Sequence, residues 1–537
     1  MTAPIKLGQT VNSSASALHA AAIQALQAGH GTEGYAAIMQ ALALTPNDAA
    51  LLNDAAAIAQ AVGDRDAARS FLLRAVAAAP CTSAYVVNLG VLHRQTGAFP
   101  AALACMDTAR TLEPRSPEVA YQRALTLARS GDDAAALAGF QHCLALRPDW
   151  FEAEVGLATA LQAQDRLAEA IGLYRRVIRR NPDRAAAHNN LGRTLLNVPD
   201  PEAALACFDR ALALAPHTGE IGYNRALTLL GLGRYAEGWR AHAARWTLVQ
   251  PPSPRRHFDG AVPRWDGTKL AGRRLLLHAE QGLGDTIQFI RFAGLARQRG
   301  LTTQGSVVFE APIPLLRLLG CLSGAGGIDR IVAQGDALPP VDVQLPLLDL
   351  PRVLDIGVSD LSPMTPYLHA DVAQPLLGNR LRVGVVWAGN PLHSNDRRRS
   401  MPAQHLRSLV QGVQAEFISL QTGPAARQLD QSGLPNVISV SPIPADFRDT
   451  AERLASLNLV VSVDTSTAHL AAAMGIATWL LVPFVPDWRW GYSGGTTPWY
   501  PTMRLFRQPR PGDWSAVCAD VRNELKAMTG RALAQPR

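Results

Sequence analysis

Three short loops of the sequence combine glycine, hydroxyl and charged residues, the residue types that bind anionic ligands. The first loop, Glu280–Asp285, follows the apolar run Arg274–His278. Gly282 and Gly284 let a backbone come close to a ligand, and Asp285 is expected at the carboxyl end of a strand, where open α/β sheets bind ligands. The third glycine of a dinucleotide fingerprint is missing. The structural alternative is that Asp285 caps the helix that follows.

The other two loops suit phosphate groups. Asp464–His469 follows the apolar run Leu457–Val463 and opens a helix of small residues, so free N–H groups and hydroxyls would meet a diphosphate there. Gly389–Pro402 follows the run Leu381–Trp387 and carries three arginines, Arg397 to Arg399. Arginines at a strand's carboxyl end favour phosphate binding. A solvated loop is the alternative interpretation.

These loops need strands before them and helices after them, and the second half of the chain predicts both. Short apolar runs alternate with helical stretches, which is typical of βαβ units and parallel sheets. The runs are Arg274–His278, Gly305–Phe309, Leu381–Trp387, Glu416–Leu420, Leu457–Val463 and Thr478–Val482. We predict a proline-rich linker at 251–269 and two α/β halves, at 270–375 and 380–530.

The first half of the chain has a different period. Prolines recur every 34 residues, at Pro46, Pro80, Pro114, Pro148, Pro182 and Pro216. Small residues recur 24 and 12 positions before each proline, where two helices of a unit approach closely. A unit of this length is a helix-turn-helix that must stack on its neighbours. Residues 13–250 therefore resemble tetratricopeptide-repeat proteins, with about seven repeats forming an α-solenoid and the last one degenerate.

Composition excludes several classes of protein. Hydrophobic residues make up 48% of the chain and charged residues 18%, as in ordinary folded proteins. We expect no signal peptide and no membrane span, and therefore a cytoplasmic protein. The six cysteines have no metal or disulfide spacing. The net charge of +7 lacks a basic stripe with aromatics, which favours an anionic small ligand over nucleic acid.

With the three loops in this order, residues from about 270 to 528 resemble the heptosyltransferase-like glycosyltransferases, a GT-B family with two facing Rossmann-like halves. The resemblance implies that Asp285 is the general base, and Glu280 is the rival candidate. Arg399 matches a phosphate-binding Lys of the family, and Ser466 stands where the family has Gly. The donor site expected here comprises Gly282, Gly284, Asn390, Arg398, Arg399, Asp464, Thr465, Ser466, Thr467 and His469.

A closer resemblance is to bacterial proteins that fuse tetratricopeptide repeats to such a transferase domain. It is carried by the loops above, by the segment Asp487–Trp490 and by Pro498–Arg507. Some members of that group glycosylate flagellin, which the repeats capture. The resemblance implies inverting, metal-independent sugar transfer from a nucleotide-sugar donor to a hydroxyl of a protein acceptor, with no cofactor.

Two further sets of residues are candidates for binding. Trp488 and Trp490 would stack on the sugar or the base of the donor, although core packing suits them equally. Amides at one phase of the repeats would face the groove and bind a peptide backbone, with solvent-facing filler as the alternative. These peptide-binding candidates are Asn88, Gln122, Asn190 and Asn224.

Two other functions remain open from the sequence. The chain could be a lipopolysaccharide-type heptosyltransferase that acts on carbohydrate, with the repeats as an assembly device. It could also be a non-catalytic repeat scaffold with a decayed transferase domain, although the presence of Asp285, His469 and the arginine loop argues against decay. The sequence does not distinguish between ADP-heptose, a CMP-linked nonulosonate and a UDP-hexose as the donor.

Overall fold

The chain forms two compact units, Met1–Thr194 and Leu195–Arg537, in the computed structural model. The structure describes residues 13–198, 200–248, 262–300, 305–324, 326–361, 364–371, 380–393, 395–432, 434, 436–439 and 442–534. The predicted fold class is confirmed, because helical repeats lead into an α/β region with parallel sheets.

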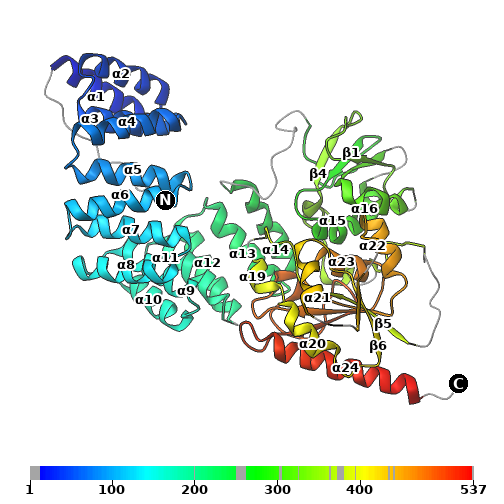
Figure 1. Ribbon diagram of the computed structural model, residues 1–537. Coiled ribbons are helices and arrows are strands. Elements are labelled where there is room, and N and C mark those ends of the chain that lie inside the picture. Colours follow the sequence, from blue (N-terminus) through cyan, green and yellow to red (C-terminus); the bar gives the residue numbers. More distant parts are fainter. Residues whose placement is uncertain are drawn as a thin grey trace. The chain divides into compact units, whose positions relative to one another are not determined.

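The first unit is a stack of helix pairs (Figure 1). Its helices are α1 (Ser13–Gln27), α2 (Gly31–Leu44), α3 (Ala49–Ala61), α4 (Arg65–Ala78), α5 (Ser83–Gln95), α6 (Phe99–Leu112), α7 (Pro117–Ser130), α8 (Asp133–Leu146), α9 (Phe151–Ala163), α10 (Leu167–Arg180) and α11 (Ala185–Leu195). The small residues of the repeat lie where helices touch: a Cβ at Gly90 of α5 would come within 2.6 Å of Met106 in α6. Close approach therefore explains the small-residue positions of the 34-residue period.

The second unit begins with repeat helices of its own. They are α12 (Pro201–Leu214), α13 (Gly219–Gly231) and α14 (Tyr235–His242), followed by the 3-10 turn η1 (Ala243–Thr247). Tyr235 and Trp239 of α14 belong to the same hydrophobic core as both sheets of this unit. The compact boundary therefore lies near Thr194, and not at residue 250 where the period of the sequence ends.

The first sheet of the unit has four parallel strands in the order β3-β2-β1-β4. The strands are β1 (Arg274–His278), β2 (Ser306–Ala311), β3 (Arg330–Ala333) and β4 (Val343–Pro346). Its helices are α15 (Leu283–Phe289), α16 (Ala293–Gly300), α17 (Leu316–Leu319) and α18 (Leu350–Val353). The predicted linker is only partly described, since 249–261 lie outside the described residues. Trp265, inside that predicted linker, is buried, and its N–H donates to the Gln344 carbonyl of β4 at 2.9 Å, so this part belongs to the sheet region.

The second sheet has six parallel strands in the order β10-β9-β8-β5-β6-β7. They are β5 (Leu381–Val386), β6 (Ala415–Ser419), β7 (Val437–Ser439), β8 (Leu459–Val463), β9 (Thr478–Val482) and β10 (Met503–Arg507). Its helices are α19 (Asp396–Arg399), α20 (Leu406–Val410), α21 (Arg427–Ser432), α22 (Phe447–Leu454), α23 (Ser466–Ala473) and α24 (Trp514–Ala534), the last drawn in red in Figure 1. Alternate residues of β8 and β9 face two different cores, so both faces of this sheet are covered.

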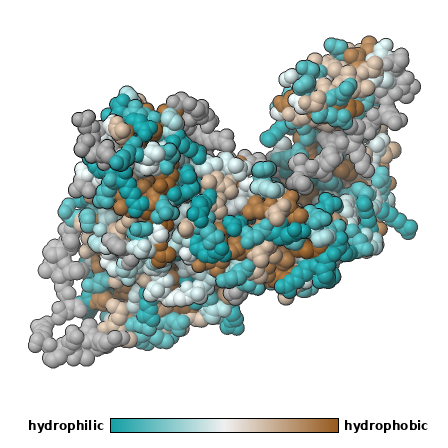
Figure 2. Space-filling view, turned by 180° about the vertical axis from the view of Figure 1, so that it is seen from behind, coloured by the Kyte–Doolittle hydropathy of each residue, from teal (hydrophilic) through white to brown (hydrophobic). Residues whose placement is uncertain are grey.

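The surface mixes polar and apolar residues. On the face seen in Figure 2, teal hydrophilic residues are interspersed with smaller brown hydrophobic groups. Among the described residues, no helix has the length and apolar character needed to cross a membrane. In the same part of the chain, no three His, Cys, Asp or Glu side chains are arranged to hold a metal ion.

Candidate functional site

Asp285 joins the two sheet regions of the second unit. It lies in the first turn of α15, just after β1, and its Oδ2 accepts a hydrogen bond from the Gly282 N–H at 2.9 Å. Its Oδ1 contacts the guanidinium of Arg489, which lies in the 3-10 turn η10 (Trp488–Trp490) after β9. The side chain of Asp285 is 20% exposed. Gly282, and not Asp285, is therefore the N-cap of α15; the Asp285 carboxylate bonds back to that N-cap and also faces a cation from the other sheet region.

Arg489 is the centre of the polar cluster. Its side chain is only 9% exposed, and it donates to Gln288 Oε1 at 2.6 Å and to Asp487 Oδ1 at 2.9 Å. Burial alone would lower the pKa of Arg489, but the carboxylates of Asp487, Asp285 and Asp464 raise it above its usual value. One buried guanidinium thus balances several carboxylates from both sheet regions. The contact with Asp487 is local in the sequence, whereas the contact with Asp285 joins residues 204 positions apart.

The loop after β8 brings Asp464 to this cluster. Thr465, the next residue, is the N-cap of α23: its Oγ1 accepts from the Ala468 N–H at 3.3 Å. Burial, followed by the charge of Asp487, raises the pKa of Asp464 to about 6, against the lowering effect of nearby groups that include Arg489. Ser466 and Thr467 form the first turn of α23 and are half-buried. The loop therefore presents a carboxylate whose charge is poorly compensated, beside the start of a helix.

His469 lies on α23 against the opposite sheet region. Its Nδ1 is 2.9 Å from the hydroxyl of Tyr500, and its Nε2 is 3.7 Å from Asp464 Oδ1. A Cβ at Gly284 would lie 3.2 Å from the imidazole Cδ2, so Gly284 allows α15 and α23 to approach each other. Burial, and then the charge of Arg489, holds the pKa of His469 well below its usual value. The imidazole is therefore neutral at neutral pH and is oriented by Tyr500.

The arginine loop after β5 reaches the same cluster through one of its arginines. Arg399 is 16% exposed, and its Nε lies 3.3 Å from Asp396 Oδ1. Burial is the largest influence on two nearby groups: it raises the pKa of Asp464 and lowers that of His393. The charge of Arg399 lowers both pKa values. The Asn390 side chain accepts from the Leu392 N–H at 3.0 Å and thereby shapes the turn.

Arg398 has a different position from the one expected. Its Nη1 donates to Asn197 Oδ1 at 2.9 Å, in the segment between α11 and α12. This contact ties the loop to the repeat helices of the second unit. Arg399 is therefore the arginine of this loop that acts on the carboxylate cluster.

Two other expectations are corrected by the contacts. Glu280 is not an accessible base: its side chain is 1% exposed, and both oxygens contact Arg245. Trp488 and Trp490 do not present open stacking surfaces, because they are 9% and 2% exposed. Trp488 packs edge-on against Trp239 of α14, with ring centroids 5.5 Å apart. Both tryptophans belong to the hydrophobic core, which was the alternative to stacking on the donor.

The polar residues expected to line the repeat groove have mixed positions. Asn88 is 9% exposed, and its amide donates to Asn53 Oδ1 at 2.6 Å, within a buried chain that continues to Asp54 and His19. Gln122 is half-buried and its Oε1 accepts from Arg94 at 3.0 Å. Asn88 is therefore mostly buried and links α5 to α3 of the neighbouring repeat. Asn190 and Asn224 are half-buried.

The residues that sequence reasoning missed come from outside the expected loops. Tyr500 orients His469, and Arg291 packs against the rings of Tyr500 and Tyr367 at 4.5 and 4.6 Å. Arg291 also donates to the Trp499 carbonyl at 2.7 Å. The paired aromatic residues Trp499 and Tyr500 were the available signal, but their partners lie far away in the sequence.

Comparisons with known proteins match both parts of the chain. A family model described as tetratricopeptide repeat matches residues 87–149, 155–217 and 195–247. Protein FlbA of Caulobacter vibrioides is 25% identical over 506 residues, which cover 82% of this chain and 83% of FlbA. The human protein O-mannosyl-transferase TMTC3 is 22% identical over 287 residues, or 52% of this chain and 29% of TMTC3.

Among solved structures, a tetratricopeptide repeat protein from Parabacteroides merdae is similar to 44% of this chain and covers 94% of its own length. Its sequence identity is 16% and the TM-score is 0.40. The matches of the family model show that the chain carries tetratricopeptide repeats. An α/β region built from two parallel sheets follows them.

Proposed function

We propose that the chain is a glycosyltransferase of the heptosyltransferase-like GT-B type, which moves a sugar from a nucleotide-sugar donor to a hydroxyl of a protein acceptor. The observation that carries the proposal is the contact of Asp285, at the carboxyl end of β1, with Arg489 after β9. It joins the ligand-binding edges of two parallel sheets at one cluster of charged groups.

The comparisons support the class of reaction. The FlbA alignment covers 82% of the chain, more than either compact unit holds, so it spans repeats and sheets together. TMTC3 is named a protein O-mannosyl-transferase, which favours sugar transfer to protein as the class of reaction. The resemblance to repeat-bearing bacterial transferases extends the proposal to flagellin as the acceptor.

In the proposed reaction, Asp285 accepts the proton of the acceptor hydroxyl. Asp285 Oδ2 accepts from the Gly282 N–H and Oδ1 contacts Arg489, and each oxygen keeps a second lone pair for the proton. The acceptor oxygen bonds to the anomeric carbon while the bond from that carbon to the diphosphate oxygen breaks, which inverts the configuration. A positioned base of this kind contributes about a hundredfold to ten-thousandfold in rate.

The leaving nucleoside diphosphate carries the developing negative charge. Arg399 supplies a charge-assisted contact, and the first turn of α23 after Thr465 supplies N–H groups and a favourable dipole. His469, neutral and oriented by Tyr500, donates or accepts a hydrogen bond on the sugar side. The nucleotide sugar is the second substrate, so this chemistry needs no further cofactor.

A double comparison tests the proposal. The full chain is incubated with ADP-, CMP- and UDP-linked sugars and with either a protein or a lipopolysaccharide acceptor, and nucleotide release is followed together with the intact mass of the acceptor. Asp285→Asn is expected to lower turnover by about a hundredfold or more while nucleotide affinity stays within about threefold. Arg399→Ala is expected to weaken nucleotide affinity about tenfold, because a charge-assisted contact to phosphate is lost.

Each result has a clear contrary outcome. Near-normal turnover by Asp285→Asn would exclude this carboxylate as the base. Unchanged nucleotide affinity in Arg399→Ala would make Arg399 a structural residue of its loop. Transfer to lipopolysaccharide carbohydrate in place of protein would favour the alternative heptosyltransferase function, and no turnover with any donor would favour a scaffold.

A further inference from the structure

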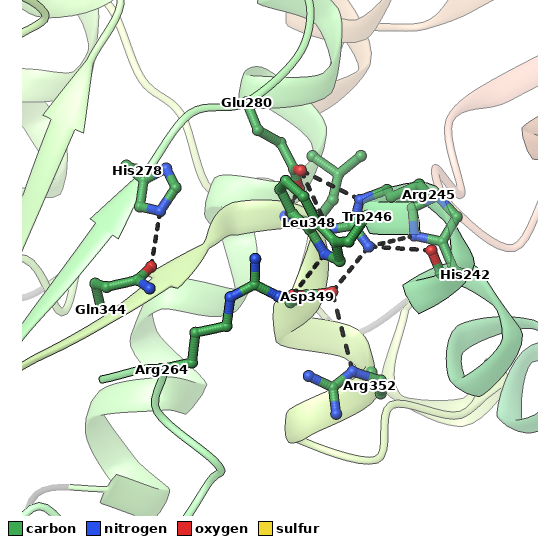
Figure 3. A network of polar contacts seen from close by, with 10 residues as sticks. All are labelled: His242, Arg245, Trp246, Arg264, His278, Glu280, Gln344, Leu348, Asp349 and Arg352. Atoms are coloured by element: carbon green, nitrogen blue, oxygen red, sulfur yellow. Dashed lines mark hydrogen bonds and ion pairs between the residues drawn. The ribbon is translucent and has the colours of Figure 1, made fainter. Parts of the chain in front are cut away.

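Arg245 forms a buried ionic network at the end of the last repeat (Figure 3). Its side chain is 0% exposed and lies in η1, directly after α14. Nη2 donates to Glu280 Oε1 at 2.8 Å, and Nη1 donates to Asp349 Oδ1 at 2.9 Å. One guanidinium therefore joins the repeat to two different segments of the first sheet region.

Residues close to Arg245 and Asp349 in the sequence add further contacts to the network. Asp349 Oδ2 accepts from the Trp246 indole N–H at 3.3 Å, and Glu280 Oε1 also accepts from the Leu348 N–H at 3.1 Å. Arg245 Nη1 lies 3.2 Å from His242 Nδ1. A guanidinium can only donate, so that imidazole nitrogen must accept. Nη1 of Arg245 thus contacts His242 and Asp349, and Nη2 contacts Glu280.

Such a network is poorly explained by stability alone. Removing a guanidinium and two carboxylates from water is costly, and apolar residues of similar volume often stabilise a core as well or better. Buried ionic groups are better suited to fixing geometry, because a planar fork meets its acceptors in few orientations. The positions of Glu280 and Asp349 therefore indicate which segments Arg245 fixes.

Glu280 is the first residue of the loop that ends in Asp285. The loop is short, and the Gly282 N–H to Asp285 contact fixes its far end. Arg245 and the Leu348 N–H fix its near end through the Glu280 carboxylate. A displacement of Glu280 would therefore be passed to Asp285 over five residues of chain.

The rest of the last repeat packs on the same region. Trp239 of α14 lies edge-on to Phe289 of α15, with centroids 5.8 Å apart, and to Trp488 beside Arg489. A Cβ at Gly231 of α13 would lie 2.7 Å from the Tyr492 ring, so α13 contacts the segment after η10. Both the Asp285 side and the Arg489 side of the cluster thus rest on this repeat.

We propose that the last repeat is a structural part of the transferase site, and that Arg245 is a positioning residue which sets Asp285 through Glu280. The inference rests on the proposed function, because it assigns a role in that reaction.

The test uses full-length variants that separate charge, fold and position. Arg245→Lys keeps the cation but loses the fork. The triple variant Arg245→Met, Glu280→Gln, Asp349→Asn leaves no unpaired buried charge, and the Gln amide oxygen can still accept from Leu348. Arg240→Ala, on the exposed face of α14, is the matched control. Turnover, KM for the nucleotide sugar, thermal unfolding and hydrogen exchange of residues 281–289 are measured for each.

We expect Arg245→Lys and the triple variant to unfold cooperatively, with kcat about tenfold to a hundredfold lower and KM for the donor within about threefold. Exchange of residues 281–289 is expected to be about tenfold faster, while α24 in the same samples is unchanged. The Arg240→Ala control is expected to match the parent protein in every measurement.

Two results would overturn the inference. One is parental kcat in the triple variant, because position would then not depend on the fork. The other is faster exchange throughout the second unit, which is the mark of a merely structural residue. If the parent protein turns over no nucleotide sugar, the proposed function fails, but the exchange of residues 281–289 still decides whether Arg245 holds this loop.

Discussion

At the level of single residues, the carboxylates of the cluster differ in how closely Arg489 pairs with them. Arg489 meets Asp285 and Asp487 directly, whereas Asp464 feels its charge from farther away. Asp464 is 17% exposed, so solvent compensates little of its charge. Residues kept at such a cost in stability are typical of functional sites, where a charge is needed for a ligand.

The raised pKa of Asp464 gives a pH-dependent expectation. An ordinary aspartate has a pKa of about 3.9, and burial raises that of Asp464 to about 6. Ionisation is therefore easier in the unfolded chain, and the free energy of unfolding falls as pH rises from about 4 to about 6. Above about pH 6, the free energy of unfolding is lowered by the full cost of ionising Asp464 in the folded protein.

Asp464→Asn is accordingly expected to raise the free energy of unfolding by about 2–3 kcal/mol at pH 7.5, since one pKa unit is about 1.4 kcal/mol. The gain should vanish below about pH 3, where the parent residue is protonated in both states. Urea unfolding at the two pH values measures it, with the exposed Asp520→Asn on α24 as control. An equal gain at both pH values would show that the charge is not its cause.

At the level of elements, buried polar contacts link the helices of successive repeats. Asn88 of α5 donates to Asn53 of α3, which in turn donates to Asp54. Thr194 donates to Gln162 Oε1 at 3.1 Å in the same way, farther along the first unit. Such buried contacts define how successive units stack, because each unpaired partner would cost free energy.

Asn88→Ala is expected to destabilise the stack by about 1–3 kcal/mol, because a buried acceptor loses its donor. Hydrogen exchange of α3 and α5 is expected to rise about tenfold or more, while nucleotide affinity is unchanged. Asn47→Ala, in the exposed turn before α3, is the control with the same side chain. Loss of acceptor binding without any change in exchange would return Asn88 to the groove.

At the level of the whole molecule, the unit that contains the candidate site begins before the α/β region. Leu230, Tyr235 and Trp239 of the repeats share a core with Phe289 and Trp499. The site therefore needs helices that the 34-residue period assigns to the solenoid. A transferase fragment cut where the period ends would lack Arg245.

Two fragments of the chain test this boundary. Residues 195–537 are expected to unfold cooperatively and to bind nucleotide with parental affinity. Residues 251–537 are expected to aggregate or to unfold at least about 10 °C lower, since Glu280 and Asp349 lose their buried partner and Trp488 loses its cover. Calorimetric unfolding and nucleotide titration compare them. A stable, nucleotide-binding 251–537 fragment would contradict a shared core.

The sequence alone determined the features that depend on neighbours along the chain. The 34-residue period predicted the helix pairs, since each unit meets only the units beside it. The apolar runs of β1 and β9 predicted Arg274–His278 and Thr478–Val482 with the observed bounds, because buried parallel strands are continuously apolar. The loops with Asp285, Asp464 and Arg399 were predicted in the same local way, from residue types after a strand.

Only the tertiary structure decided which of these residues meet. Arg489 is 204 residues from Asp285, and Arg245 is 104 residues from Asp349, and no period or spacing relates such positions. Short strands such as β3 and β4 were missed because their partners, not their own residues, make them strands. Glu280 was assigned to catalysis, and Trp488 and Asn88 to binding, because their residue types suit those roles, but burial gave all three protein partners.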